Sequence, residues 1–463
     1  MSKKSDKKTV FVCQQCGKES LKWLGRCPDC QQWNTFMETA VSVPVPSSRS
    51  RSPVSSPQEL SQVTIESADR FPLSLNEFSR VLGGGLVSGS LVLIAGDPGI
   101  GKSTLLLQAS ASVAESRGGN VVYVSGEETL RQIKLRAERL GVKGEGLYLL
   151  AETDIEAILS QIEQLSPSLV VIDSIQTINI PELDATPGSI TQVRECTLRL
   201  MQWAKAGAVP IFIAGHVTKD GAIAGPRVLE HIVDVVLYLE GEPFSAYRLL
   251  RCVKNRYGST NEVGVFEMKG QGLVEVDNPS RAFLSQRGVE AMGSAVVPTL
   301  EGSRPLLVEI QALTTPTSFG LPRRTANGVD FNRLLLITAV LTKRVGLRLG
   351  NQDIIVNVTS GLKIGEPAAD LGIALAIASS FRDMGVDPDL MAVGEVGLSG
   401  ELRAVPQLDR RVDEAARLGF KRCLVPRAGA RVSSKDIELI PVSTLREAVG
   451  VGLVKGKART EGD

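Results

Sequence analysis

Aromatic residues are scarce in this 463-residue chain, at 4%, so its cores are expected to be packed mainly with aliphatic side chains. The formal net charge is only +1, which gives no overall sign that would draw the chain to nucleic acid or to a membrane surface. No apolar stretch approaches the roughly 20 residues of a membrane span, and no hydrophobic signal core follows the basic segment Met1–Lys8. We therefore expect a cytoplasmic protein whose DNA contacts, if any, are made by local patches.

The length allows about three domains, and the composition changes along the chain. Residues 41–57 consist mostly of Ser and Pro, which cannot bury a core, so they are expected to form an extended linker. We place a cysteine-bearing unit at 1–38, the linker at 39–60, an α/β domain at 61–282 and a second α/β domain at 283–463.

Strand-like and helix-like runs alternate between residues 60 and 280, which predicts a mostly parallel sheet with covering helices. The last runs follow one another without helices, so the sheet is expected to end in antiparallel strands. The predicted strands are Leu91–Gly96, Val121–Ser125, Leu169–Asp173, Pro210–Gly215, Val233–Leu239 and Arg248–Val253, with helices at Glu128–Leu140 and Ile190–Ala206. The last region is predicted to hold helices at Phe331–Arg344, Asp370–Ser380 and Gln407–Leu418, and strands at Ile354–Val358 and Cys423–Val425.

Four of the seven cysteines lie together, as Cys13-x-x-Cys16 and Cys27-x-x-Cys30, with ten residues between the pairs. In a cytosolic protein such a cluster indicates a metal site rather than disulfides. Four thiolates form the closed tetrahedral set of a structural zinc site, with iron as the alternative. A unit of about 25 residues has little core, so the metal would hold its fold. The residues between the pairs that either contact DNA or protein or are simply solvated are Lys18, Lys22, Trp23 and Arg26.

Residues 96–104 fit G-x-x-x-x-G-K-[ST], the phosphate-binding loop of nucleotide hydrolases. The apolar run before the loop suits a buried parallel strand, and the residues after it begin a helix whose N-terminus would face an anion. Lys102 would reach the β- and γ-phosphates, and Ser103 would hold Mg²⁺. The predicted ATP-binding residues are Gly96, Asp97, Pro98, Gly99, Ile100, Gly101, Lys102, Ser103 and Thr104.

Two acidic segments follow the loop. Leu169–Asp173 is an apolar strand that ends in an aspartate, the usual Walker B form, and Asp173 would order Mg²⁺ through water. Glu127 and Glu128 come just after the predicted strand Val121–Ser125, which we expect to lie next to the phosphate-loop strand. Glu127 is the candidate that orients the attacking water, whereas Glu128 is expected to begin the next helix, where its charge suits the helix dipole.

Polar residues at the ends of two later strands are further candidates. His216 ends the strand Pro210–Gly215, at the rim where such sheets bind ligands, and is either a γ-phosphate sensor or a histidine with an ordinary structural role. Lys254-Asn255-Arg256-Tyr257-Gly258 closes a late strand. Its cations, Lys254 and Arg256, could reach the phosphates of a neighbouring subunit, bind DNA or form an exposed basic turn.

The order of these motifs resembles the bacterial RadA (Sms) family of RecA-like DNA repair ATPases. The segments that carry the resemblance are the four cysteines, Leu82-Gly83-Gly84-Gly85-Leu86 before the phosphate loop, Val124-Ser125-Gly126-Glu127-Glu128, Val171-Ile172-Asp173-Ser174 and the Lys254–Gly258 motif. The family signature at the last position reads Lys-Asn-Arg-Phe-Gly, so Tyr257 replaces Phe while both cations are retained. The resemblance covers nearly the whole chain.

Such a resemblance implies a DNA-dependent ATPase of DNA repair and homologous recombination. Members of the family form hexameric rings like the DnaB helicase, bind single-stranded and branched DNA, and promote branch migration of recombination intermediates with the RecA recombinase. The implied cofactors are ATP, Mg²⁺ and Zn²⁺. The resemblance places Glu127 at the catalytic glutamate of RecA-like proteins, and it assigns Lys254 and Arg256 to a motif implicated in DNA-dependent function.

The C-terminal region resembles the Lon protease domain. Gly365–Asp370 lies where Lon has its nucleophile segment, with Ala368 at the serine, and counting on from Gly394–Gly400 puts Asp409 at the lysine of the catalytic dyad. Because neither residue can do that chemistry, the region is expected to keep the fold, without peptidase activity, and to assemble a ring. The cations that either line a DNA path or form solvated surface are Arg304, Arg323, Arg324, Lys343, Arg344 and Arg348.

The fold class is therefore predicted to be α/β, with an N-terminal Cys₄ zinc-ribbon-like unit, a RecA-like P-loop ATPase core and a C-terminal Lon-protease-like domain. The leading function is a DNA-stimulated motor ATPase. An ATP-gated, DNA-binding scaffold without translocation is the alternative, and an ATP-dependent protease is opposed by Ala368 and Asp409. Glu127 and Asp173 favour turnover of ATP.

Overall fold

The computed structural model describes residues 7–42, 59–62, 70–216, 228–242, 245–284, 292–318, 320–429 and 436–454. By its internal contacts the chain divides into two compact units. The first consists of Met1–Glu240 and Arg248–Glu275, and the second of Gly241–Tyr247 and Val276–Asp463. Within the described residues, no helix has both the length and the apolar character needed to cross a membrane.

The N-terminal residues form a three-stranded antiparallel sheet in the order β2-β1-β3. Its strands are β1 (Lys7–Cys13), β2 (Glu19–Ser20) and β3 (Phe36–Ser42). β3 pairs with β1 along its whole length, from Phe36 opposite Cys13 to Ser42 opposite Lys7. Residues 39–42, expected in the linker, therefore belong to a strand. Residues 43–58 of that linker lie outside the described part of the chain.

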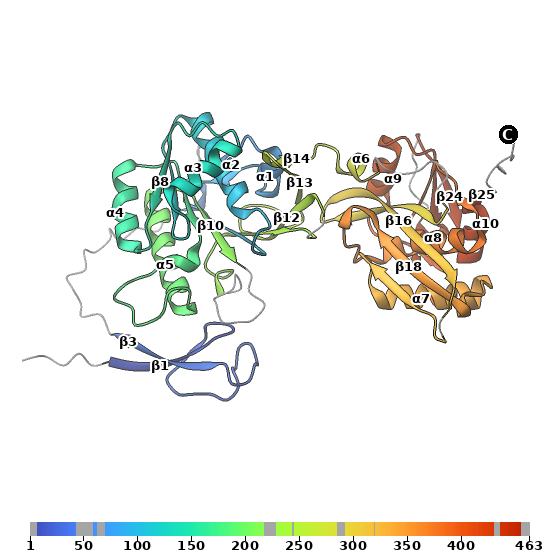
Figure 1. The fold of residues 1–463 in the computed structure, drawn as a ribbon, viewed down its shortest axis with the longest axis horizontal. Helices are drawn as coiled ribbons and strands as arrows, with labels where there is room; N and C mark the ends of the chain where they lie inside the picture. Colours follow the sequence, from blue (N-terminus) through green and yellow to red (C-terminus); the bar gives the residue numbers. More distant parts are fainter. Residues whose placement is uncertain are drawn as a thin grey trace, which may run out of the picture. The chain divides into compact units, whose positions relative to one another are not determined.

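The next segment forms a nine-stranded sheet in the order β14-β13-β12-β11-β6-β10-β9-β7-β8 (Figure 1). The strands from β11 to β8 run parallel, whereas β12 is antiparallel to β11 and β14 is antiparallel to β13, as expected from the missing helices. The strands are β6 (Leu91–Gly96), β7 (Val121–Ser125), β8 (Leu147–Ala151), β9 (Leu169–Asp173), β10 (Ile211–His216), β11 (Val235–Glu240), β12 (Tyr247–Asn255), β13 (Val263–Lys269) and β14 (Gly272–Glu275). A small antiparallel ladder of β4 (Arg70–Phe71) and β5 (Leu86–Val87) precedes them.

One expectation about strand order is wrong. β7, which carries Glu127 beyond its end, does not lie next to the phosphate-loop strand β6, because β10 and β9 lie between them. Crossover helices allow a later strand to insert between two earlier ones, so sequence order alone does not give neighbours in such a sheet. β7 instead pairs with β9, with Ser125 opposite Asp173. The end of the Walker B strand and the segment with Glu127 are thus brought together.

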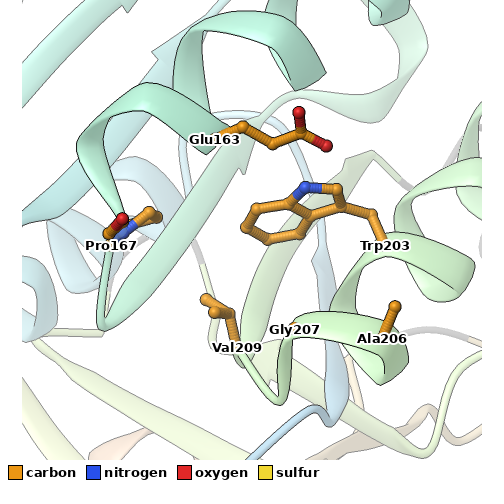
Figure 2. Close-up of a pocket in the computed structure, with 7 residues that line it drawn as sticks. Glu163, Pro167, Trp203, Ala206, Gly207 and Val209 are labelled. Atoms are coloured by element: carbon orange, nitrogen blue, oxygen red, sulfur yellow. The ribbon is translucent and has the colours of Figure 1, made fainter.

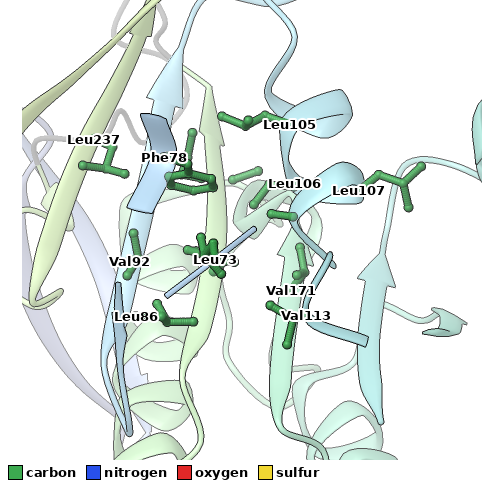
Figure 3. Packing of buried hydrophobic residues seen from close by; sticks show 14 of the residues in the cluster. Leu73, Phe78, Leu86, Val92, Leu105, Leu106, Leu107, Val113, Val171 and Leu237 are labelled. Carbon is green, nitrogen blue, oxygen red and sulfur yellow. The ribbon is translucent and has the colours of Figure 1, made fainter. Parts of the chain in front are cut away.

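Helices cover both faces of this sheet, because alternate residues of the buried strands point to opposite sides. Val92 and Tyr123 belong to a hydrophobic cluster with α1, α2 and α3, whereas Leu93 and Val122 belong to a second cluster with α4 and α5. The helices are α1 (Asn76–Val81), α2 (Lys102–Arg117), α3 (Leu130–Arg139), α4 (Ile155–Leu165) and α5 (Ile190–Gly207). Figure 3 shows part of the first cluster, which is mainly aliphatic as the composition predicts. Its buried aromatic members are Phe71, Phe78, Tyr123, Phe212 and Phe266.

The start of α3 corrects the expectation for Glu128. Thr129 is the N-cap, and its side chain and that of Gln132 form a reciprocal capping box. Glu128 therefore precedes the cap instead of beginning the helix. Its carboxylate pairs with the guanidinium of Arg136, which lies on α3. This pairing occupies Glu128, whereas Glu127 faces the neighbouring strand ends.

The second unit contains a seven-stranded mixed sheet in the order β17-β18-β16-β15-β20-β23-β24. Its strands are β15 (Ser294–Glu301), β16 (Arg304–Pro316), β17 (Arg324–Asn327), β18 (Gln352–Val358), β20 (Leu390–Ala392), β23 (Arg422–Pro426) and β24 (Glu438–Val442). Two short ladders pair β19 (Gly385–Val386) with β25 (Leu453–Val454), and β21 (Glu395–Val396) with β22 (Leu402–Arg403). The helices are α6 (Pro279–Leu284), α7 (Phe331–Val340), α8 (Asp370–Arg382), α9 (Leu408–Arg417) and α10 (Leu445–Gly452).

Helix α8 is the centre of this second unit. Every residue from Asp370 to Ser379 is buried, which is the burial expected of a helix that is apolar on all sides. The expected helix Phe331–Arg344 is shorter than predicted, since α7 ends at Val340 and a π-helical turn follows over Leu341–Val345.

Candidate functional site

The four clustered cysteines converge beside the N-terminal sheet. Their Sγ atoms all lie within 4.8 Å of one another. The Sγ atoms of Cys13 and Cys30 are 3.6 Å apart, and those of Cys16 and Cys27 are 3.5 Å apart. Four thiolates around a zinc ion at about 2.3 Å place the sulfurs about 3.8 Å from one another. The cluster therefore fits a tetrahedral zinc site. The few apolar residues around it, chiefly Phe36, form too small a core to hold the fold of this unit without a metal.

The residues between the two cysteine pairs lie on the surface of this unit. The Lys18 ammonium is 3.3 Å from the Asp29 carboxylate, so it pairs within the unit. The Trp23 indole N–H donates to the carbonyl of Phe36, while most of its ring is exposed. The Arg26 guanidinium lies 5.7 Å from the centre of the Trp33 ring.

The phosphate loop connects β6 to α2. Gly101 is the N-cap of α2, and its φ of +117° lies in the left-handed region that favours glycine. The side chain of Lys102 is 4% exposed, and its ammonium donates to the carbonyls of Gly96 at 2.9 Å and Asp97 at 3.0 Å. Burial lowers the pKa of Lys102, and the charges of Asp173, Asp97 and Glu127 oppose that shift. The Lys102 ammonium thus lies at the phosphate loop, and the nearby acidic side chains stabilise its charge.

Asp173 ends the Walker B strand β9, which is separated from β6 by β10, and it is buried. The hydroxyl of Tyr123, on β7, donates to its Oδ2 at 2.5 Å. Burial, with the charge of Asp173, raises the pKa of Tyr123 well above its ordinary value, so the phenol stays protonated and remains a donor. Tyr123 is a contact of the candidate site that the sequence reasoning missed. A phenol inside a buried aliphatic strand needs a polar partner, and that was the signal available in the sequence.

Glu127, Ser174 and His216 come together at the carboxyl end of the parallel strands. The Ser174 hydroxyl donates to Glu127 Oε1 at 2.5 Å, and His216 Nε2 is 3.3 Å from the same oxygen. His216 ends β10, which lies between β6 and β9, so it stands between the phosphate loop and the Walker B strand. Three residues predicted separately from the sequence, namely Glu127, Asp173 and His216, thus lie on one rim with Lys102.

The Lys254–Gly258 motif lies at the opposite end of the same sheet, where the parallel strands begin. Asn255 is opposite Val235 on β11, and Val235 is opposite Val92 on β6, which is the start of the strand that leads into the phosphate loop. The length of β6, which is about 17 Å over the five steps from Leu91 to Gly96, therefore separates the motif from its own loop. The Lys254 ammonium donates to the carbonyls of Glu230 at 2.6 Å and Val233 at 2.9 Å.

The positions that match the Lon dyad do not face one another. Ala368 is buried in a hydrophobic cluster with Val412 and Val425, whereas Asp409 is exposed on the first turn of α9. Arg411, which is 0% exposed, makes two hydrogen bonds to the Glu366 carboxylate, at 2.7 and 2.6 Å. An ion pair therefore occupies the region that corresponds to the dyad. Among the cations expected on this unit's surface, Arg324 is half-buried and donates to the carbonyls of Leu349 and Gln352.

A pocket of about 520 Å³ lies between the C-terminal ends of α4 and α5 (Figure 2). Glu163 and Trp203 line it together with Pro167 and Val209, which precede β9 and β10. It is therefore at the edge of the sheet where the parallel strands begin, away from the phosphate loop, and it contains none of the predicted site residues.

Comparisons with known proteins bear on the whole chain. Relatives called DNA repair protein RadA are 55% identical in Halalkalibacterium halodurans, 52% in Bacillus subtilis strain 168 and 51% in Listeria monocytogenes. Each match covers 96% of this chain and 98% or 99% of the relative. The chain belongs to the RadA family of DNA repair proteins.

Family models match the three parts of this RadA-family chain. They are described as a rubredoxin metal binding domain over residues 11–38, an AAA domain over residues 55–222 and subunit ChlI of Mg-chelatase over residues 319–429. The predicted family and fold class are confirmed: a zinc ribbon, a P-loop ATPase core and a Lon-like C-terminal domain. A solved KaiC-like protein from Pyrococcus horikoshii OT3 matches with a TM-score of 0.38 and 22% identity, over 45% of this chain and 98% of that one.

Proposed function

We propose that this RadA-family chain is a DNA-dependent ATPase of the cytoplasm that binds single-stranded DNA and promotes branch migration of recombination intermediates. It would act as a ring of identical copies, a homo-hexamer, and cooperate with the RecA recombinase. The domain bounds proposed for it are 1–38 for the zinc unit, 39–60 for the linker, 61–282 for the ATPase domain and 283–463 for the Lon-like domain.

The observation that carries this proposal is the group of polar residues at the carboxyl ends of β6, β7, β9 and β10. Lys102 would bind the β- and γ-phosphates, and the loop from Gly96 to Thr104 would surround them with backbone N–H groups. Ser103 and Asp173 would hold Mg²⁺, which neutralises charge on the phosphates when bound. Glu127 would accept the hydrogen bond of the attacking water and orient it toward the γ-phosphate.

His216 would report the state of that γ-phosphate. It is 3.3 Å from Glu127 Oε1 and lies at the last residue of β10. The residues that follow it, 217–227, lie outside the described part of the chain. A change at Glu127 on hydrolysis would therefore reach the end of β10 directly, through a single contact.

The position of the Lys254–Gly258 motif supports action between copies of the chain. Its cations are separated from their own phosphate loop by the length of β6, so a nucleotide they contact must be bound by another copy. Arg256 would then stabilise charge on the transferred phosphoryl group, as cations supplied by a neighbour do in other phosphate-loop hydrolases. This arrangement requires an assembly in which the Lys254–Gly258 motif of one copy faces the phosphate loop of the next copy.

Displacement of a strand from branched DNA tests the proposal. A labelled three-stranded junction is incubated with the intact protein and ATP, and the released strand is measured on a native gel, with Lys102→Ala as the control. We expect release with ATP by the intact protein alone, while both proteins bind the junction. Binding and ATP turnover without any release would favour the ATP-gated scaffold, and ATP-dependent degradation of casein would favour the protease.

A further inference from the structure

One buried carboxylate, that of Asp234, joins three separate parts of the ATPase domain. It is 3% exposed, and its Oδ2 accepts hydrogen bonds from the backbone N–H of Leu91 at 3.1 Å and from the ammonium of Lys205 at 2.7 Å. Its Oδ1 is 3.5 Å from the guanidinium of Arg256, and its backbone carbonyl accepts from the N–H of Arg256 at 3.2 Å. Leu91 is the first residue of β6, so one side chain links the start of the phosphate-loop strand to the Lys254–Gly258 motif.

Lys205, near the end of α5, extends this link. Its ammonium also donates to the hydroxyl of Tyr257 at 3.0 Å and lies 5.8 Å from the centre of that ring. Burial lowers the pKa of Lys205, but its hydrogen bonds to Asp234 and Tyr257 outweigh burial and raise it, so the lysine stays charged. The family signature has Phe at position 257, and Phe lacks the hydroxyl that Lys205 contacts. This chain therefore has a contact that the signature residue could not make.

The two cations of the motif are in different situations. Lys254 directs its ammonium at two backbone carbonyls of the same chain, 2.6 and 2.9 Å away. Arg256 is 55% exposed, and the contact of its guanidinium with Asp234 is long, at 3.5 Å. A guanidinium has five N–H donors, so Arg256 keeps donors that face outward while Asp234 fixes where it points. Lys254 is thus suited to holding the motif in place, and Arg256 to contacting an anion.

We propose that Asp234 and Lys205 are positioning residues, which hold the motif so that Arg256 reaches a phosphate of the nucleotide bound by a second copy of the chain. The Tyr257 hydroxyl is the third member of this group. The inference rests on the proposed function, since it concerns how fast ATP is turned over. Because the group lies at the far edge of the sheet from its own loop, its loss should leave ATP binding intact and lower the rate of the step that Arg256 assists.

Single substitutions test the positioning role. Asp234→Asn and Lys205→Met are expected to lower kcat on the order of ten- to a hundredfold, as misplacement of a reacting group does, with an unchanged KM for ATP. Lys205→Arg should restore most of the rate, and Tyr257→Phe should lose only a few-fold. The control is Lys134→Met, which removes an exposed pair with Glu138 on α3 and should change neither constant. An unchanged kcat in Asp234→Asn and Lys205→Met, with or without a raised KM for ATP, would overturn the inference.

Mixing two defective proteins tests whether the group serves a neighbouring copy. Lys102→Ala has a defective loop and an intact motif, and Asp234→Asn has the reverse. If Arg256 acts on a second copy, the mixture turns over ATP faster than the sum of the two proteins measured alone. A mixture that equals that sum, with subunit exchange verified by fluorescence transfer, would contradict action between copies. If the intact protein itself does not hydrolyse ATP, the proposed function fails, and that result is distinct from a failure of the positioning role.

Discussion

At the scale of single residues, the geometry of Asp173 depends on a side chain that carries no charge. The phenol of Tyr123 donates to Asp173 Oδ2 at 2.5 Å, and both residues are buried. A buried carboxylate without a donor is unfavourable, so this hydrogen bond contributes to stability as well as to the direction in which the carboxylate points.

Tyr123→Phe is therefore expected to lower the free energy of unfolding by about 1.5–3 kcal/mol at pH 7.5, the usual size for a hydrogen bond to a charged group. Urea unfolding followed by circular dichroism measures it, and Tyr148→Phe is the control, because Tyr148 on β8 is exposed. Burial and Asp173 raise the pKa of Tyr123, so the advantage of the native residue is complete below the unfolded tyrosine pKa near 10 and is lost as pH rises further. Equal unfolding free energies at pH 7.5 would refute this account.

The residue patterns predicted the chemistry of the site better than its contacts. Lys102 and the four cysteines were recognisable from the spacing of their motifs, and Asp173 from the apolar strand that it ends. No motif in the sequence distinguishes the role of Glu127 from that of Glu128. In the structure a capping box places Glu128 outside the helix that it was expected to begin. Asp234 gave no signal at all, since its partners Leu91, Lys205 and Arg256 are far apart in the chain.

At the scale of helices and strands, the ion pair of Arg411 with Glu366 fixes α9 to the rest of the Lon-like domain. Arg411 also donates to the carbonyl of Pro298 on β15 at 2.6 Å and to that of Pro406 at 3.1 Å. The guanidinium itself is 0% exposed, while the Glu366 carboxylate is 24% exposed. Removal of Arg411 would leave this mostly buried carboxylate without its cation.

Arg411→Met is therefore expected to lower the free energy of unfolding of the second unit by about 3–5 kcal/mol. Arg403→Met is the matched control, because Arg403 pairs with Glu401 at the surface, where such pairs contribute little to stability. Limited proteolysis with increasing urea measures both. Similar losses for the two variants would show that the buried pair is not what holds α9 in place.

The order of the strands was the part of the fold that the sequence could not supply. Six strands of the nine-stranded ATPase sheet were predicted from apolar runs, whereas β8, β13 and β14 were not, and the antiparallel edge followed from missing helices. The insertion of β10 and β9 between β6 and β7 depends on how the helices cross over, which no local pattern encodes. That insertion brings Ser174 to Glu127 and Tyr123 to Asp173.

At the scale of the whole molecule, the zinc unit and the ATPase core are stabilised differently. The zinc unit has a small cluster centred on Cys13, Cys27 and Phe36, whereas the ATPase sheet has large clusters on both faces. We therefore expect zinc to be needed for the fold of the zinc unit and not for that of the ATPase core.

Removal of zinc with a chelator should change the fluorescence of Trp23 and Trp33 and leave DNA-independent ATP turnover within about two-fold, as expected when the ligand stabilises only the part that binds it. Tryptophan emission and turnover are measured on the same sample, and added zinc should reverse the change. Loss of basal turnover in parallel with the emission change would contradict independent folding of the two parts.

ATP turnover, with and without single-stranded DNA, is the most direct test of the central claim. The intact chain, Lys102→Ala, Glu127→Gln and Glu128→Gln are compared, with nucleotide binding measured in parallel. We predict strong stimulation by DNA in the intact chain, none in Lys102→Ala, and a kcat lower by about 10²–10⁴ in Glu127→Gln, which still binds ATP. Glu128→Gln should keep most of its activity, because Glu128 pairs with Arg136. Negligible, unstimulated turnover by an intact chain that binds both ATP and DNA would contradict the account.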